Sequence, residues 1–441
     1  MEGATSTRGK KRDAAILRGV VASVAVRVIS AGVAVLTLGI AARALTREEF
    51  GFVAALFSLW MILTMFDFGV GGALVTRVAS THARDAFDEM RAHVREALIA
   101  LTAIGSLIAV AGAVSAFVLP WARWVGGTLP TATVRPSVIL VFALAGAALP
   151  AAIGILTLTG RQRLATAQLG MALRGVLTLI ATAAAAFMGL GPWAFVLAVV
   201  GPPTLVSLAL TAWVVFGELR GVLAHGGVAA GSIKSTIRAS AYFAVYVIGN
   251  TVALGTGTVI VATVLGPGEA ALFSVASRMF TIAGTVVMTS GAQLWPAMTE
   301  AIERGDDAWA RSRYWHGIAV AGLVTAAAGM GLVVFGRPIA RVWVGSALVP
   351  PLDLLVWTAA LTLVMTVASQ AGVLLLAVDR IRELAAVCVV NAAVGVTASV
   401  LLTQSMGMSG AAVGAFLSCL VVLLPGIAAL AHRALKGLGD G

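Results

Sequence analysis

Long apolar stretches, separated by short clusters of charged residues, run along the whole chain. A helix needs about 20 apolar residues to cross the hydrocarbon core of a bilayer, and cutting the sequence at its charge clusters leaves twelve segments of that size. The pattern predicts an all-α polytopic membrane protein with twelve transmembrane helices. The segments cover residues 18–43, 50–75, 97–119, 137–158, 165–189, 192–216, 237–265, 270–294, 314–335, 353–377, 384–404 and 409–431.

The composition excludes several other classes of protein. Of the 441 residues, 60% are hydrophobic and 11% are charged, whereas soluble domains carry about 25% charged residues. Soluble enzymes, secreted disulfide scaffolds and disordered chains are therefore excluded. The two cysteines, Cys388 and Cys419, lie in apolar stretches and are expected to pack as small hydrophobic residues. The apolar run after Arg12 is too long for a signal peptide, so it is interpreted as the first retained span.

The distribution of basic residues orients the predicted spans. Twelve is an even number, so both termini lie on the same side of the membrane. When the loops are assigned alternately, the face that holds the termini carries 21 of the 30 Lys and Arg residues, and the opposite face carries six. The positive-inside rule then places both termini in the cytoplasm. We expect the membrane that the chain crosses to be the cytoplasmic membrane of the cell. The cytoplasmic segment Thr81–Glu96 mixes charges at helical spacing, which predicts a short surface helix.

Short motifs recur at a nearly constant shift of 218 to 220 residues, which indicates an internal duplication. Each repeat holds six spans, so the two halves, residues 1–220 and 221–441, are predicted to be parallel six-helix bundles around a central cavity. Rocking such bundles against each other exposes the cavity alternately to each face, so the repeat points to alternating-access transport. The matched segments are Leu45–Phe52 and Leu265–Leu272, Trp124–Gly126 and Trp343–Gly345, Arg161–Arg163 and Arg380–Arg382, and Met188–Gly189 and Met406–Gly407.

Several of these stretches resemble one known family. The segments Arg43–Gly51 and Asp67–Gly71, with Arg77, resemble the opening of polysaccharide biosynthesis flippases in the multidrug/oligosaccharidyl-lipid/polysaccharide (MOP) exporter superfamily. Leu294–Met298, followed by Glu300, is similar to the end of their eighth span. The span number, the two-repeat layout and the length also fit. The resemblance implies a flippase that moves undecaprenyl-diphosphate-linked sugars from the inner to the outer leaflet.

Four ionisable residues lie inside predicted spans: Arg27, Asp67, Arg174 and Arg278. A charge at bilayer depth costs about 2.5 kcal/mol or more to insert, so such residues are candidates for function. From their spacing to Arg18 and Arg77, Arg27 and Asp67 are expected about 13 to 15 Å inside the cytoplasmic boundary, where they could pair across the first two spans. A pair that only locks two helices remains the alternative.

Arg174 and Arg278 are each expected about nine residues into a span, without a carboxylate left to neutralise them. Snorkelling of the side chain toward an interface is the alternative interpretation. At the repeat shift these two residues correspond to an alanine and to Ser58, and neither Arg27 nor Asp67 is duplicated. This asymmetry favours a role in substrate binding over a role in the scaffold.

Three arginines against one aspartate suit an anionic ligand. A guanidinium matches phosphate geometry and stays charged when it is desolvated, whereas a proton-coupled cation exporter needs carboxylates in the membrane. We therefore predict that Arg27, Arg174, Arg278 and Asp67 bind the lipid diphosphate. The partners expected are the lipid-linked oligosaccharide, the membrane, coupling ions or the membrane potential, and the glycosyltransferases and polymerase of the same pathway.

Other chemistries find little support in the sequence. Gly231–Thr236 lacks the glycine spacing of a phosphate-binding loop, and the five histidines have no ligand spacing, so no enzyme activity, cofactor or metal site is predicted. The net charge of +11 fits loops that face anionic lipid, with no nucleic-acid partner. Three alternatives stay open: a drug or cation antiporter of the same superfamily, a peptidoglycan-precursor (lipid II) flippase, and a membrane-bound glycosyltransferase or polymerase.

The orientation can be tested by labelling single cysteines with a membrane-impermeant reagent. Cysteines at Ala4, Gly226 and Gly439 should report the cytoplasm, and cysteines at Gly127 and Ser346 should report the outside, because basic residues favour the cytoplasmic face. Reversal at two of these sites would overturn the topology.

Overall fold

The computed structural model describes residues 32–161, 163–220, 255–281, 307–378 and 380–437, together with isolated residues between 245 and 302. Within these ranges the chain is helical, and no strand occurs among the described residues. Of the described helices, eight are long and apolar enough to cross a membrane, and Gly32–Ala44 and Gly255–Leu265 are shorter apolar helices. The four remaining predicted spans, 18–43, 50–75, 237–265 and 270–294, are broken or lie partly outside the described residues.

The first half of the chain begins with the helix Gly32–Ala44 and continues as a series of packed hairpins. Helix α4 packs along α5 and α7 packs along α8. The pair α4 and α5 approaches closely because Gly105 and Gly146 face each other's backbone carbonyls. The bounds are α2 (Arg47–Leu63), α3 (Val70–Ala83), α4 (Phe87–Val118), α5 (Thr131–Ala151), α6 (Ile153–Gly160), α7 (Leu164–Phe187) and α8 (Pro192–Ala212), with π-helical turns η1 (Ala122–Gly126) and η2 (Trp213–Glu218).

The second half repeats this kind of packing. It includes the helices Gly255–Leu265 and 267–281, and then two packed pairs in which α11 lies along α12 and α13 along α14. The bounds are α11 (Asp307–Val344), α12 (Leu352–Ala377), α13 (Ile381–Met406), α14 (Met408–Ser418) and α15 (Leu424–Gly437), with the short turns η3 (Ser346–Leu348) and η4 (Cys419–Leu423).

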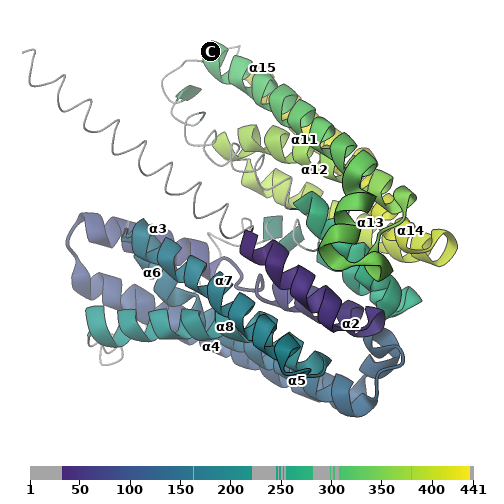
Figure 1. The fold of residues 1–441 in the computed structure, drawn as a ribbon. Helices are drawn as coiled ribbons and strands as arrows, with labels where there is room; N and C mark the ends of the chain where they lie inside the picture. Colours follow the sequence, from purple (N-terminus) through teal and green to yellow (C-terminus); the bar gives the residue numbers. More distant parts are fainter. Residues whose placement is uncertain are drawn as a thin grey trace, which may run out of the picture.

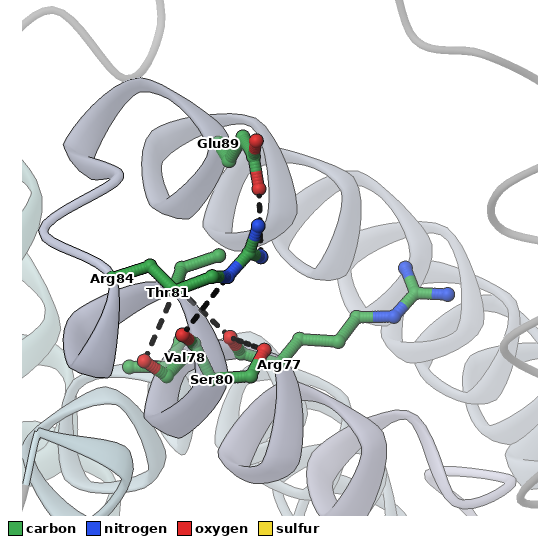
Figure 2. Close-up of polar contacts among 6 residues, drawn as sticks. All are labelled: Arg77, Val78, Ser80, Thr81, Arg84 and Glu89. Carbon is green, nitrogen blue, oxygen red and sulfur yellow. Dashed lines mark hydrogen bonds and ion pairs between the residues drawn. The ribbon is translucent and has the colours of Figure 1, made fainter.

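Two sequence predictions about single elements are wrong. Segment 50–75 is not one helix, because α2 ends at Leu63 and α3 begins at Val70. Thr81–Glu96 is not a separate surface helix either: α3 continues to Ala83, the chain turns, and α4 begins at Phe87. Figure 2 shows this turn, where Arg84 donates to the Ser80 carbonyl at 3.3 Å and to the Glu89 carboxylate at 3.0 Å. The charged residues of this segment thus belong to the end of α3, the turn after it and the start of α4.

Matched motifs of the two halves occupy equivalent places. Helices α7 and α13 both give way at a Met–Gly step, and Gly189 and Gly407 both adopt positive φ values, 62° and 69°. Glycine pays little for this left-handed conformation, which ends a helix and reverses the chain. The duplication itself stays a prediction, with this local agreement in its favour.

The hydrophobic core is divided unevenly between the two halves. One large cluster of buried residues is shared, with Phe52 and Phe195 from the first half and Phe280 and Leu355 from the second. A second cluster draws only on residues 70–219 and a third only on residues 298–434. In Figure 1 the helices of the two halves accordingly converge at the end of the molecule where α2 begins and diverge toward the other end. We call these the Arg47 end and the Arg84 end.

The two turns with matched motifs, Leu45–Phe52 and Leu265–Leu272, meet each other at the Arg47 end. Thr46 and Glu49 form a capping box that starts α2 and thereby leaves the Arg47 side chain free to reach the second half. Its Nε donates to the Gly268 carbonyl at 2.9 Å, and its Nη2 lies 2.6 Å from the Glu269 carboxylate. Thr128, from the loop after η1, donates to the Glu48 carboxylate beside this pair.

The backbones of these two turns also come into direct contact. A Cβ placed on Gly51 would lie 1.5 Å from the Pro267 carbonyl oxygen, so only glycine permits this approach. Two more contacts join the halves nearby: the Trp343 indole donates to the Val35 carbonyl at 2.7 Å, and Arg43 donates to the Val342 carbonyl at 2.5 Å. The Arg47 end is therefore closed by packed backbone and several hydrogen bonds.

Gly51→Ala tests the contact between the halves. The added methyl group meets a backbone carbonyl that cannot rotate away, so the variant should lose about 3 kcal/mol of stability, as overpacked cores do. Gly331→Ala is the matched control, because Gly331 also lies in a helix and an added Cβ there would meet open space, with no neighbouring atom within 4 Å. The measurement is thermal unfolding in detergent. Equal melting temperatures for the two variants would contradict the close approach.

Candidate functional site

Arg174 projects from α7 toward α8. Its Nη2 donates to the Ser207 hydroxyl at 2.5 Å, and that hydroxyl donates to the Pro203 carbonyl at 2.5 Å. The Nε of Arg174 is buried and has no hydrogen-bond partner within the described chain. A neutral hydroxyl orients the guanidinium without cancelling its charge.

Arg278 lies on the helix 267–281 and faces α2 of the other half. Its guanidinium carbon is 5.0 Å from the centroid of the Phe57 ring, within the range of a cation–π contact. The Phe57 ring in turn stacks on Trp60, with centroids 5.9 Å apart and planes inclined by 27°. Trp60 is 9% exposed, and its indole N–H has no partner among the described residues.

Carboxylates neutralise other arginines of the described chain. Glu269 pairs with Arg47, Glu96 with Arg77, and Glu218 with both Arg161 and Arg163. By contrast, no ion pair of the described residues involves Arg174 or Arg278. Over the ranges that the structure describes, these two guanidinium groups contact different helices, α8 for Arg174 and α2 for Arg278, and their role in substrate binding stays a prediction.

Asp67 has a local role that the sequence reasoning missed. Its carboxylate accepts from the backbone N–H groups of Gly69 at 2.9 Å and Gly71 at 3.1 Å, and so caps the start of α3. The chain reverses its twist just before this helix, because Phe68 and Gly69 have φ values of 49° and 79°. An Asp-x-Gly sequence after a buried helix is the signal that could have predicted this break.

The expected depth of Asp67 rests on one continuous helix that reaches Arg77, but α2 ends at Leu63 and α3 begins at Val70. The depth of Asp67 in a membrane therefore stays a prediction. Arg27 lies outside the described residues, so its pairing with Asp67 stays a prediction.

Among the described residues there is no group of three or more His, Cys, Asp or Glu side chains that could hold a metal ion. The sequence pattern did not indicate three residues that lie beside the two arginines: Ser207 contacts Arg174, Phe57 contacts Arg278, and Trp60 stacks on Phe57. Each is uncharged, and its relevance depends on which helix packs beside it, so no motif marks it in advance.

The arrangement of helices has counterparts among solved structures of membrane transporters. An inward-facing multidrug resistance MATE family transporter of the MOP superfamily matches with a TM-score of 0.80 and 14% identity over 92% of this chain and 94% of the other. An outward-facing MATE transporter matches at 0.67, with 15% identity over 94% of both chains. A MOP superfamily transporter from Pyrococcus furiosus matches at 0.67, with 14% identity over 94% and 95%. The chain has the fold of MOP-superfamily transporters.

The family itself follows from the sequence. The model of the polysaccharide biosynthesis protein family matches residues 16–302, which is more than half of the chain, and the chain belongs to this family. The resemblance seen in Arg43–Gly51 and Asp67–Gly71 is thereby confirmed. A comparison with curated proteins gives no match.

Substitution of Asp67 distinguishes a helix cap from an ion pair. Asp67→Ala should cost about 1 kcal/mol, as loss of an N-cap does, and Asp67→Asn should cost less because the amide oxygen still accepts a hydrogen bond. If Asp67 instead neutralises Arg27, Asp67→Asn should cost several kcal/mol, and adding Arg27→Gln should restore stability. Thermal unfolding of the single and double variants decides between these outcomes.

Proposed function

We propose that the protein is an alternating-access flippase that moves an undecaprenyl-diphosphate-linked oligosaccharide from the inner to the outer leaflet. The observation that carries this proposal is the pair Arg174 and Arg278, two guanidinium groups in apolar helices without a carboxylate partner in the described chain. Such charges are expensive in a membrane and are kept where a ligand uses them. A diphosphate offers the oxygen geometry that guanidinium groups bind best. Membership of a polysaccharide biosynthesis family supports the sugar-linked substrate.

The charge distribution argues against a cation exporter. Cation–proton exchange needs an intramembrane carboxylate that can change its protonation. Asp67 is occupied by backbone N–H groups, and Glu96 is paired with Arg77. The Pyrococcus furiosus transporter is described as having a binding pocket of reverse polarity that suggests a different function. A positively charged substrate site in this chain would likewise differ in polarity from the site of a cation exporter.

The described state corresponds to an inward-facing transporter. The shared hydrophobic core, the Arg47–Glu269 pair and the Gly51 contact close one end, which the distribution of basic residues assigns to the outside. At the other end each half has a core of its own. The better match to the inward-facing MATE structure than to the outward-facing one supports this assignment.

Transport then requires the Arg47 end to open. The polar contacts that hold it are modest: the side chains of Arg47 and Glu269 are 41% and 35% exposed, and an exposed ion pair contributes about 0.2 to 1 kcal/mol. Apolar burial in the shared core is the larger part. Differential binding of the substrate to the two states, or a coupling ion, would supply the free energy that shifts the population outward.

Reconstitution into proteoliposomes tests the function directly. Wild-type protein should translocate an undecaprenyl-diphosphate-linked oligosaccharide, and Arg278→Ala and Arg174→Ala should each lower the rate by about tenfold or more, since loss of one charged hydrogen-bonded contact costs about 1.5 to 3 kcal/mol. Both variants should fold, because removing an uncompensated charge relieves desolvation.

The matched control is Arg135→Ala. Arg135 also lies 5.0 Å from an aromatic ring, that of Phe117, but on an exposed part of α5, so its removal should leave transport unchanged. Normal translocation by well-folded Arg174→Ala and Arg278→Ala variants would remove these residues from the site. Export of a cationic dye with no movement of the lipid-linked sugar would overturn the proposal in favour of the antiporter.

A further inference from the structure

The contact between Arg278 and Phe57 suggests how a charge is held in the membrane and kept ready for a ligand. Resting on the proposed function, we infer that Phe57 is a positioning residue: its ring holds the Arg278 guanidinium by a cation–π contact and leaves the N–H groups of that guanidinium for the substrate diphosphate. The guanidinium carbon lies over the ring at 5.0 Å. This distance is within the range of about 6 Å at which the ring quadrupole attracts a cation.

A ring and a carboxylate stabilise an arginine in different ways. A carboxylate accepts hydrogen bonds from the guanidinium fork and cancels its charge, as Glu218 does for Arg161 and Arg163. An aromatic face attracts the cation without accepting any N–H···O hydrogen bond and without adding a negative charge. With respect to the described residues, Arg278 therefore retains both features that a phosphate recognises, its positive charge and N–H groups without an acceptor.

The position of the Phe57 ring is itself fixed by packing. Phe57 lies one helical turn before Trp60, and their rings stack at 5.9 Å. Trp60 is buried in the core that the two halves share, so it cannot move without disturbing that core. Because Trp60 supports the Phe57 ring, the ring holds the Arg278 guanidinium at a defined location.

The contact joins the two halves of the transporter at matching depth. Phe57 is ten residues beyond Arg47 on α2, and Arg278 is nine residues beyond Glu269 on the helix 267–281, so both lie about 14 to 15 Å from the Arg47–Glu269 pair. Because the two helices start from turns that touch, they bring the ring and the guanidinium together. An anion bound to Arg278 therefore lies beside the Arg278–Phe57 contact between the halves. This contact must change when the Arg47 end opens.

Stepwise fluorination of Phe57 tests this inference. Incorporating mono-, di- and trifluorophenylalanine at position 57 weakens the ring quadrupole and nearly preserves the shape of the side chain. The affinity for undecaprenyl diphosphate in detergent, used as the probe without any sugar, should fall at each step and by about threefold to tenfold for trifluorophenylalanine, in line with the strength of desolvated cation–π contacts. Phe57→Tyr should retain the wild-type affinity, and Phe57→Leu should lose it as strongly as the trifluoro variant.

The same series at Phe117 is the matched control. The guanidinium carbon of Arg135 also lies 5.0 Å from the centroid of the Phe117 ring, but Phe117 is exposed. Fluorination of Phe117 should therefore not alter the affinity for undecaprenyl diphosphate. A flat affinity across the Phe57 series, with Arg278→Ala still weakening the probe, would overturn the positioning role and leave the proposed flippase intact. Failure of the wild-type protein to bind undecaprenyl diphosphate at all would overturn the proposed substrate and this inference together.

Discussion

The close approach of the two halves at Gly51 and Pro267 is the constraint on which the rest of the described structure depends. Backbone can meet backbone there only because Gly51 has no side chain. Once the turns touch, Arg47 reaches Glu269 and α2 runs beside the helix 267–281. The apolar residues of both halves then merge into one core at this end, while the other end keeps two separate cores.

The same constraint determines where charge can be used. Hydrocarbon cannot solvate a guanidinium, so each arginine in a span needs a partner from a neighbouring helix. At the ends of the molecule the partners are carboxylates, and the charge is cancelled. Deeper in the helices the partners are a hydroxyl for Arg174 and an aromatic ring for Arg278. These uncharged partners orient the guanidinium groups without cancelling their charge, which is what the proposed recognition of a diphosphate requires.

The break between α2 and α3 also leaves polar groups that need partners. The chain unwinds between α2 and α3, where Asp67 supplies acceptors to N–H groups that have no partner within a helix. Non-helical backbone at membrane depth is tolerated only where such groups are satisfied or line a polar space. The break therefore divides one predicted span between two helices, α2 and α3.

Local properties of the chain were readable from the amino-acid sequence. Eight apolar runs appear as helices long and apolar enough to span a membrane, although their ends extend up to ten residues beyond the predicted bounds, as in Phe87–Val118. Length and hydropathy suffice to predict such a helix. The family was also readable from short motifs such as Arg43–Gly51. The partners of Arg174 and Arg278 were not, because they lie 33 and 221 positions away along the chain. Hydropathy averages over neighbours along the chain, whereas a charge in the membrane is stabilised by neighbours in space, and only the packing of helices decides which those are.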